Sequence, residues 1–207
     1  MGATDGNLTI SVLGPTVVRI AGVPLALSAG EAHLVALLVA AEGDGLDADA
    51  LASGYWPDEL PKTWMTGLRN AITRLNRKTR KAGAGDLITK ATRQRRLEVP
   101  SDAVDAWRLL TAAEADTPQV DLGLFRGEPF EGCEIGDRLR AASDRLQAAR
   151  RDLLTRYIGG GGEMTSQLTE AAIALGLGDL VPDTSRPPAN PRSWSRRLER
   201  LAPDPLL

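Results

Sequence analysis

The sequence predicts an α+β fold, in which a small antiparallel sheet, three helices and a β-hairpin precede an all-helical region. Three observations support this. Short β-rich segments separated by Gly and Pro fill the first 27 residues, helical apolar spacing follows, and beyond residue 100 only helical patterns recur. With 43% hydrophobic and 25% charged residues among 207, the chain has the composition of a protein with a buried core.

Three short strands are expected at the N-terminus, over residues 8–13, 16–20 and 23–27. Leu8, Ile10 and Val12 alternate with other residues, as in a strand with one buried face. Gly14-Pro15 and Ala21-Gly22 separate the segments. Their length and spacing predict one small antiparallel sheet.

Three helices are expected next. Ser28 and Glu31 have the spacing of a capping box, which predicts a helix that ends near Gly43. Asp47 is placed to cap a short second helix over residues 48–54. A third helix is expected over residues 62–81, since one apolar stripe recurs at steps of three and four residues. That stripe consists of Leu68, Ala71, Ile72, Leu75 and Thr79.

A β-hairpin is expected directly after the third helix. Its strands are predicted over residues 87–90 and 96–99, joined by a five-residue tip over residues 91–95. Arginines crowd this tip and the start of the second strand. The sequence therefore predicts a hairpin with a basic end.

The remainder of the chain is predicted to be helical. Helices are expected over residues 101–115, 137–157 and 164–177, with a connector over residues 118–134. We divide the chain into a first domain over residues 8–100 and a shortened helical-repeat domain of the TPR type over 101–180. A Pro- and Arg-rich tail over 181–207 is expected to be largely extended.

The charge distribution is uneven. Residues 61–100 contain eleven basic and two acidic residues, a net charge of +9, whereas residues 1–60 carry −7 and residues 101–158 carry −3. The whole chain carries only −2. A concentrated patch of one sign attracts a polyanion through counterion release and steers its approach.

A sheet, three helices and a basic hairpin in this order are typical of a winged-helix domain, whose third helix enters the major groove of DNA. Arginine binds guanine or phosphate, asparagine pairs with adenine, and threonine binds phosphate or the thymine methyl group. A solvated helix face without a partner is the alternative, but the adjoining basic hairpin favours DNA. On this helix the candidate DNA contacts are Thr66, Arg69, Asn70, Thr73, Arg74 and Arg77.

Several segments resemble the actinobacterial antibiotic regulatory proteins (SARP family). The segments that carry the resemblance are Val12–Pro15, Gly22–Leu27, Leu51–Asp58, Leu68–Lys78, Leu87–Thr89, Leu97–Asp105 and Leu124–Phe130. The resemblance spans roughly residues 8–157. There are three departures. Asn76 stands where the family usually has arginine, Arg93–Arg96 replaces a Gly-Tyr wing tip, and the helical region is short.

The resemblance implies an OmpR/PhoB-type winged helix followed by a bacterial transcriptional activation domain (BTAD). It further implies a DNA site of direct repeats, on which a dimer could assemble, and recruitment of RNA polymerase, with the loop Pro57–Pro61 as the contact. By position, Lys62 and Thr66 would face phosphate. The remaining expected DNA contacts are Lys78 on the helix and Arg93, Arg95 and Arg96 on the wing.

The sequence thus predicts a sequence-specific, double-stranded DNA-binding regulator of transcription, with activation as the expected output. Two alternatives stay open: a winged-helix adaptor whose basic face binds an acidic protein, and a terminal part of a larger regulator without DNA binding of its own. The shortened helical region and Asn76 motivate the first alternative.

No enzyme activity, metal or cofactor is expected. His33 is the only histidine and Cys133 the only cysteine, so neither a multi-histidine metal site nor a disulfide framework is available. No apolar run reaches the ~18 residues of a membrane span, and the first residues lack the pattern of a signal peptide. A cytoplasmic location is expected.

Overall fold

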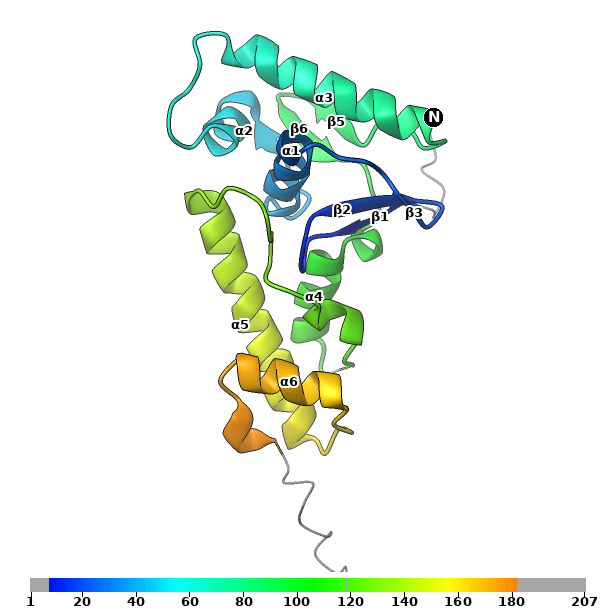
Figure 1. Ribbon diagram of the computed structural model, residues 1–207, viewed down its shortest axis with the longest axis vertical. Helices are drawn as coiled ribbons and strands as arrows, with labels where there is room; N and C mark the ends of the chain where they lie inside the picture. The colour runs from blue at the N-terminus through cyan, green and yellow to red at the C-terminus, as the bar shows by residue number, and fades with distance from the viewer. Residues whose placement is uncertain (1–7, 118, 182–207) are drawn as a thin grey trace, which may run out of the picture.

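The computed structural model describes residues 8–117 and 119–181, so the predicted tail lies outside it except for Val181. Within that part, two three-stranded sheets and six α-helices form one elongated molecule. Helix α3 (Trp64–Lys81) lies across one end of it, and α6 (Ser166–Ala174) lies at the other end (Figure 1).

The first sheet contains β1 (Leu8–Ser11), β2 (Val17–Ile20) and β3 (Val23–Pro24), which pair antiparallel in that order. Ala21 and Gly22 connect β2 to β3 with φ values of 52° and 76°. Positive φ at both turn positions matches the right-handed twist of the strands. The predicted N-terminal sheet is confirmed, although β3 is shorter than expected.

Helix α1 (Ala29–Val39) is buried on almost every side. The predicted capping box is present. The Ser28 hydroxyl accepts from the Glu31 amide at 3.3 Å, and the Glu31 carboxylate accepts from the Ser28 amide at 2.8 Å. His33 is buried in this helix, with its Nε2 2.9 Å from the carbonyl oxygen of Gly54 in α2.

A two-residue strand, β4 (Leu46–Asp47), precedes α2 (Ala48–Tyr55) and was not predicted. It pairs with β6 (Gln94–Leu97), which in turn pairs with β5 (Ile88–Ala91), giving a second sheet in the order β4-β6-β5. The Asp47 carboxylate accepts from the Ala50 amide at 2.7 Å, which confirms the predicted cap.

Helices dominate the chain after residue 100, as predicted. They are α4 (Asp105–Glu114), α5 (Asp137–Gly159) and α6, together with short 3₁₀ turns at Ser101–Ala103, Leu122–Phe125 and Gly178–Leu180. The helix expected over residues 101–115 begins later than predicted, because Ser101–Ala103 forms its own 3₁₀ turn and α4 begins only at Asp105.

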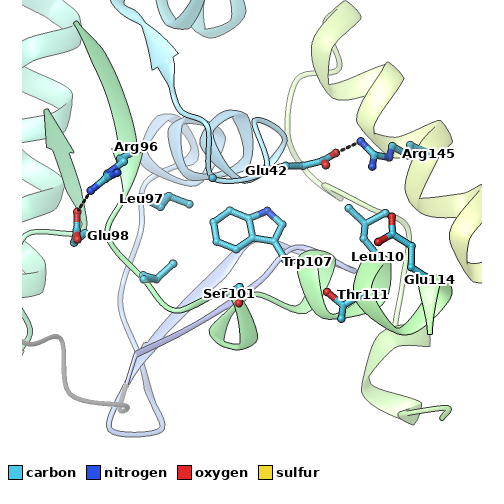
Figure 2. A pocket seen from close by; sticks show the side chains of 12 residues that line it. Glu42, Arg96, Leu97, Glu98, Ser101, Trp107, Leu110, Thr111, Glu114 and Arg145 are labelled. Carbon is cyan, nitrogen blue, oxygen red and sulfur yellow. Dashed lines mark hydrogen bonds and ion pairs between the residues drawn. The ribbon is translucent and has the colours of Figure 1, made fainter. Parts of the chain in front are cut away.

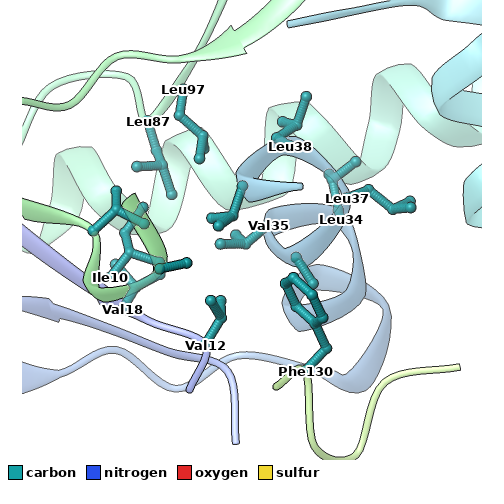
Figure 3. Close-up of a cluster of buried hydrophobic side chains, with 14 of the residues drawn as sticks. Ile10, Val12, Val18, Leu34, Val35, Leu37, Leu38, Leu87, Leu97 and Phe130 are labelled. Atoms are coloured by element: carbon teal, nitrogen blue, oxygen red, sulfur yellow. The ribbon is translucent and has the colours of Figure 1, made fainter. Parts of the chain in front are cut away.

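One buried cluster continues across residue 100, the predicted domain boundary. Val104 forms a parallel bridge with Ile10 of β1, and the amide of Phe130 donates to the Val12 carbonyl oxygen at 2.7 Å. The Phe130 ring lies against α1 near Val12 (Figure 3), and it belongs to the same buried cluster as Leu97 of the second sheet. The change from strands to helices therefore does not interrupt the core.

Candidate nucleic-acid interface

Helix α3 is amphipathic, and its buried side fixes how its other side is presented. Its fully packed residues are Leu68, Ala71, Leu75, Asn76 and Thr79. The predicted stripe is confirmed except that Ile72 is half-buried and Asn76 takes a buried place. The helix begins at Trp64 instead of Lys62, which lies in the preceding turn where the Trp64 amide donates to the Pro61 carbonyl oxygen.

The opposite side of α3 forms an exposed polar row, which we call the α3 outer face. Its members are Thr66, Arg69, Asn70, Thr73, Arg74, Arg77 and Lys81. Because α3 crosses one end of the molecule, this face points away from the other helices (Figure 1). Lys81 is a member that the sequence interpretation left out, although its charge and helical position could have identified it.

The charges of the α3 outer face are available for a ligand. Among the described residues, Arg69, Arg74, Arg77 and Lys81 make no ion pair. Thr73 donates its hydroxyl to the Arg69 carbonyl oxygen at 2.8 Å, which holds that side chain against the helix. Four cations without an ion-pair partner among the described residues, on one exposed helix face, create a strongly positive local potential.

Lys78 has a different surrounding from the other predicted contacts. Its Nζ lies 2.5 Å from the Glu31 carboxylate and donates to the Ala26 carbonyl oxygen at 2.8 Å. The Glu31 side chain is only 4% exposed, whereas that of Lys78 is 38% exposed. The pair fastens α3 to the first turn of α1, so Lys78 already has a structural partner.

The environment of Glu31 lowers the pKa of its carboxyl group from the ordinary value of 4.5. Burial alone would raise it. The hydrogen bond from Lys78, the bonds from the Ser28 amide and hydroxyl, and the positive charge of Lys78 outweigh burial together. Glu31 is therefore charged at neutral pH, and Lys78 stabilises this nearly buried charge.

The wing hairpin differs from its prediction. A two-residue turn, Thr92-Arg93, replaces the expected five-residue tip, and Ala91 pairs directly with Gln94. Thr92 has a φ of 58°, which allows this tight turn. The prediction of a five-residue tip was wrong, because Ala91, Gln94 and Arg95 were assigned to the loop, whereas all three are paired in the strands.

The three wing arginines therefore occupy different positions. Arg93 is exposed in the turn, whereas Arg96 is exposed in β6 with its Nη2 3.5 Å from the Glu98 carboxylate. Arg95 alternates onto the same strand face as buried Leu97 and is half-buried, opposite exposed Lys90. Arg93 and Lys90 are thus the exposed cations of the hairpin that make no ion pair within the described residues, and Lys90 was not among the predicted contacts.

Asn76 connects α3 to the wing. Its Nδ2 donates to the Ile88 carbonyl oxygen at 2.7 Å, and its Oδ1 accepts from the Ile88 amide at 2.9 Å. Nearby, the Thr79 hydroxyl donates to the Gly85 carbonyl oxygen at 2.8 Å. These bonds fix the first wing strand against the helix and position the two basic elements together.

The described residues contain no group of three or more His, Cys, Asp or Glu side chains that could hold a metal ion. Burial raises the pKa of the Cys133 thiol, and a weaker contact with the Thr16 hydroxyl opposes this shift. None of the helices described here is long and apolar enough to cross a membrane.

No protein-family model matches the chain, and no curated protein matches it either. Among solved structures, the chain is similar to Mycobacterium tuberculosis EmbR in complex with a low affinity phosphopeptide, with a TM-score of 0.57 and 17% sequence identity. The chain shares the fold of EmbR. The match covers 96% of this chain and 66% of EmbR, so this chain spans about two thirds of that protein's length. The predicted α+β, winged-helix-like architecture is confirmed in this respect.

Proposed function

We propose that this protein is a sequence-specific, double-stranded DNA-binding regulator of transcription. The observation that carries the proposal is the α3 outer face, on a helix at one end of the molecule. There, arginines that make no ion pair within the described residues alternate with an exposed amide and hydroxyls. The likeness in fold to EmbR supports the winged-helix-like architecture, and the proposal that the ligand is DNA depends on the α3 outer face.

The dimensions of α3 suit the major groove. A helix with its side chains is about 10–12 Å wide, and the groove is about 12 Å wide. From Thr66 to Arg77 the α3 outer face runs roughly 16 Å along the helix, which is the length of about five base pairs. Arg69 and Arg77 are then suited to guanine or phosphate, and Asn70 to adenine.

The wing and the helix start supply phosphate contacts in this proposal. Arg93 in the turn, with Lys90 beside it, would bind backbone on one side of the groove, and Lys62 would bind it on the other. Such contacts orient the protein without reading sequence. Lys78, already paired with Glu31, would contribute charge rather than a direct bond.

The partners implied by the SARP and BTAD resemblance are part of the proposal. Direct repeats in the target would let two copies bind side by side. The exposed loop before α3, with Asp58, Glu59 and the 42% exposed Leu60, would contact RNA polymerase. Replacing Leu60 by Ala should lower transcription in a purified system while leaving the affinity for DNA unchanged; a matching loss of DNA affinity would contradict this role.

The central test selects binding sites from a random duplex library and measures affinity by fluorescence anisotropy. Replacing Arg69 and Arg77 together by Ala should lower the affinity for the selected site by at least about 30-fold, since each good base contact contributes roughly 1–3 kcal/mol. The matched control replaces exposed Arg140 and Arg151 of α5 and should stay within about twofold. Failure of the unaltered protein to bind any duplex at low salt would overturn the proposal and favour an acidic protein as the partner of α3.

A further inference from the structure

A cleft of about 510 Å³ opens where the wing, the end of α1, α4 and α5 meet (Figure 2). Its walls come from both sides of residue 100: Arg96 and Leu97 belong to the wing strand β6 and Val99 follows it, whereas Trp107 and Leu110 belong to α4. Its volume lies within the ~300–1,000 Å³ of small-molecule sites, which prefer such junctions.

The inner wall of the cleft is aromatic and apolar. Trp107 is half-buried, and its Nε1 donates to the Val39 carbonyl oxygen at 2.9 Å, which fixes the orientation of the ring. Leu97, Val99 and Leu110 line the cleft beside it. A rigid indole bordered by aliphatic side chains suits a planar or branched apolar group.

The rim of the cleft retains one unmatched negative charge. Arg145 lies 2.5 Å from Glu42, and Arg96 lies 3.5 Å from Glu98, so both arginines face carboxylates of this chain. Glu114 makes no ion pair or hydrogen bond within the described residues. The charge left for a ligand is therefore that of a carboxylate.

Trp107, Thr111 and Glu114 follow one another along a single face of α4, at steps of four and three residues. The first and last of them are roughly 10 Å apart along the axis, so the indole and the carboxylate lie at the two ends of this face. Indole faces also attract cations. The Glu114 carboxylate and the Trp107 indole both favour a positively charged ligand.

We propose that this cleft binds a small amine that carries an aromatic or branched apolar group. The apolar part would lie against Trp107, Leu97 and Leu110, and the ammonium group would pair with Glu114 within reach of the Thr111 hydroxyl. This site lies apart from the α3 outer face, and the proposal does not depend on DNA binding.

Three probes that share a phenylpropyl group and differ in charge test the proposal: 3-phenylpropylamine, 3-phenylpropan-1-ol and 4-phenylbutyrate. Each is titrated to about 10 mM into the full ¹⁵N-labelled chain, without DNA. The reporter is the Trp107 indole N–H signal, assigned from its absence in Trp107→Phe, together with the Thr111 amide. The amine should bind about two- to fivefold more tightly than the alcohol, as for a partly exposed ion pair, and the acid should bind most weakly.

Glu114→Gln should erase the difference between the amine and the alcohol without changing the spectrum elsewhere, because Glu114 is exposed. The matched control is Glu170→Gln on α6, which should preserve the preference. Absence of any shift at Trp107, equal binding of the acid, or an amine preference that survives in Glu114→Gln would each overturn the proposal.

Discussion

The Asn76 side chain bonds both backbone polar groups of Ile88, donating to its carbonyl oxygen at 2.7 Å and accepting from its amide at 2.9 Å. An amide is the side chain that can make this pair of bonds at once. At a position where the resembled family usually has arginine, this chain therefore has a buried connection between α3 and the wing. The departure changes how the wing is held and leaves the exposed charges of the α3 outer face as they are.

Replacing Asn76 by Ala should destabilise the protein by about 2–4 kcal/mol, because two buried backbone groups of Ile88 lose their partners. Urea unfolding followed by circular dichroism measures the change. Asn70→Ala on the exposed side of the same helix is the control and should stay within about 0.5 kcal/mol. Equal effects of the two substitutions would mean that the bonds to Ile88 contribute nothing.

The Glu31–Lys78 pair predicts how stability depends on pH. Because the pKa of Glu31 in the folded protein lies below its ordinary value of 4.5, the charged carboxylate stabilises the fold above that pH. This contribution is lost as the pH falls through the lowered pKa. The free energy of unfolding should thus fall less steeply between about pH 5 and 3 in Glu31→Gln than in the unaltered protein.

The same pair predicts the effect of removing Lys78. Lys78→Ala leaves a nearly buried carboxylate without its cation and should cost about 1–3 kcal/mol at pH 7. The loss should shrink in the Glu31→Gln background, where no charge needs the lysine. Additive effects of the two substitutions in a double-mutant cycle would show that the residues do not interact.

Local signals explain which parts of the fold the sequence predicted well. The Ser28–Glu31 capping box, the Asp47 cap and the α3 stripe each depend on residues within one or two helical turns, and each is present. The exposed row on α3 followed directly from the stripe, since helical geometry assigns the opposite side.

Long-range pairing explains what the sequence did not predict. β4 has only two residues, too few to alternate, and it is a strand because distant β6 pairs with it. The Lys78–Glu31 pair joins residues 47 positions apart, so nothing in the basic pattern distinguished Lys78 from Arg77. Likewise, the half-buried place of Arg95 depends on strand register, which a misplaced turn shifted.

Asp105 predicts that the regions before and after residue 100 unfold together. Its buried carboxylate accepts from the amides of Val12 and Leu13 at 2.8 and 3.2 Å and lies 3.1 Å from Arg126. Asp105→Ala should cost about 3 kcal/mol or more, since buried donors lose their acceptor. Tryptophan fluorescence and circular dichroism should still report one coincident transition. Exposed Asp102 is the nearby control, and two separate transitions would contradict a shared core.

Salt dependence separates the two roles that we propose for the wing and the α3 outer face, which are phosphate contact and base reading. Arg93→Ala on the wing should lower the slope of log K against log salt by ~0.9, since one phosphate contact is lost, and should weaken selected and random duplexes alike. Asn70→Ala should leave the slope unchanged and weaken binding of the selected duplex only, by about 1–3 kcal/mol.

The matched control is Arg80 on α3, whose Nη1 lies 2.5 Å from Asp86. Arg80→Ala should alter the slope less than Arg93→Ala does, because the charge of Arg80 is already paired within the protein. An Arg80 effect as large as the Arg93 effect would mean that net charge alone, without a defined phosphate contact at the wing, attracts the DNA.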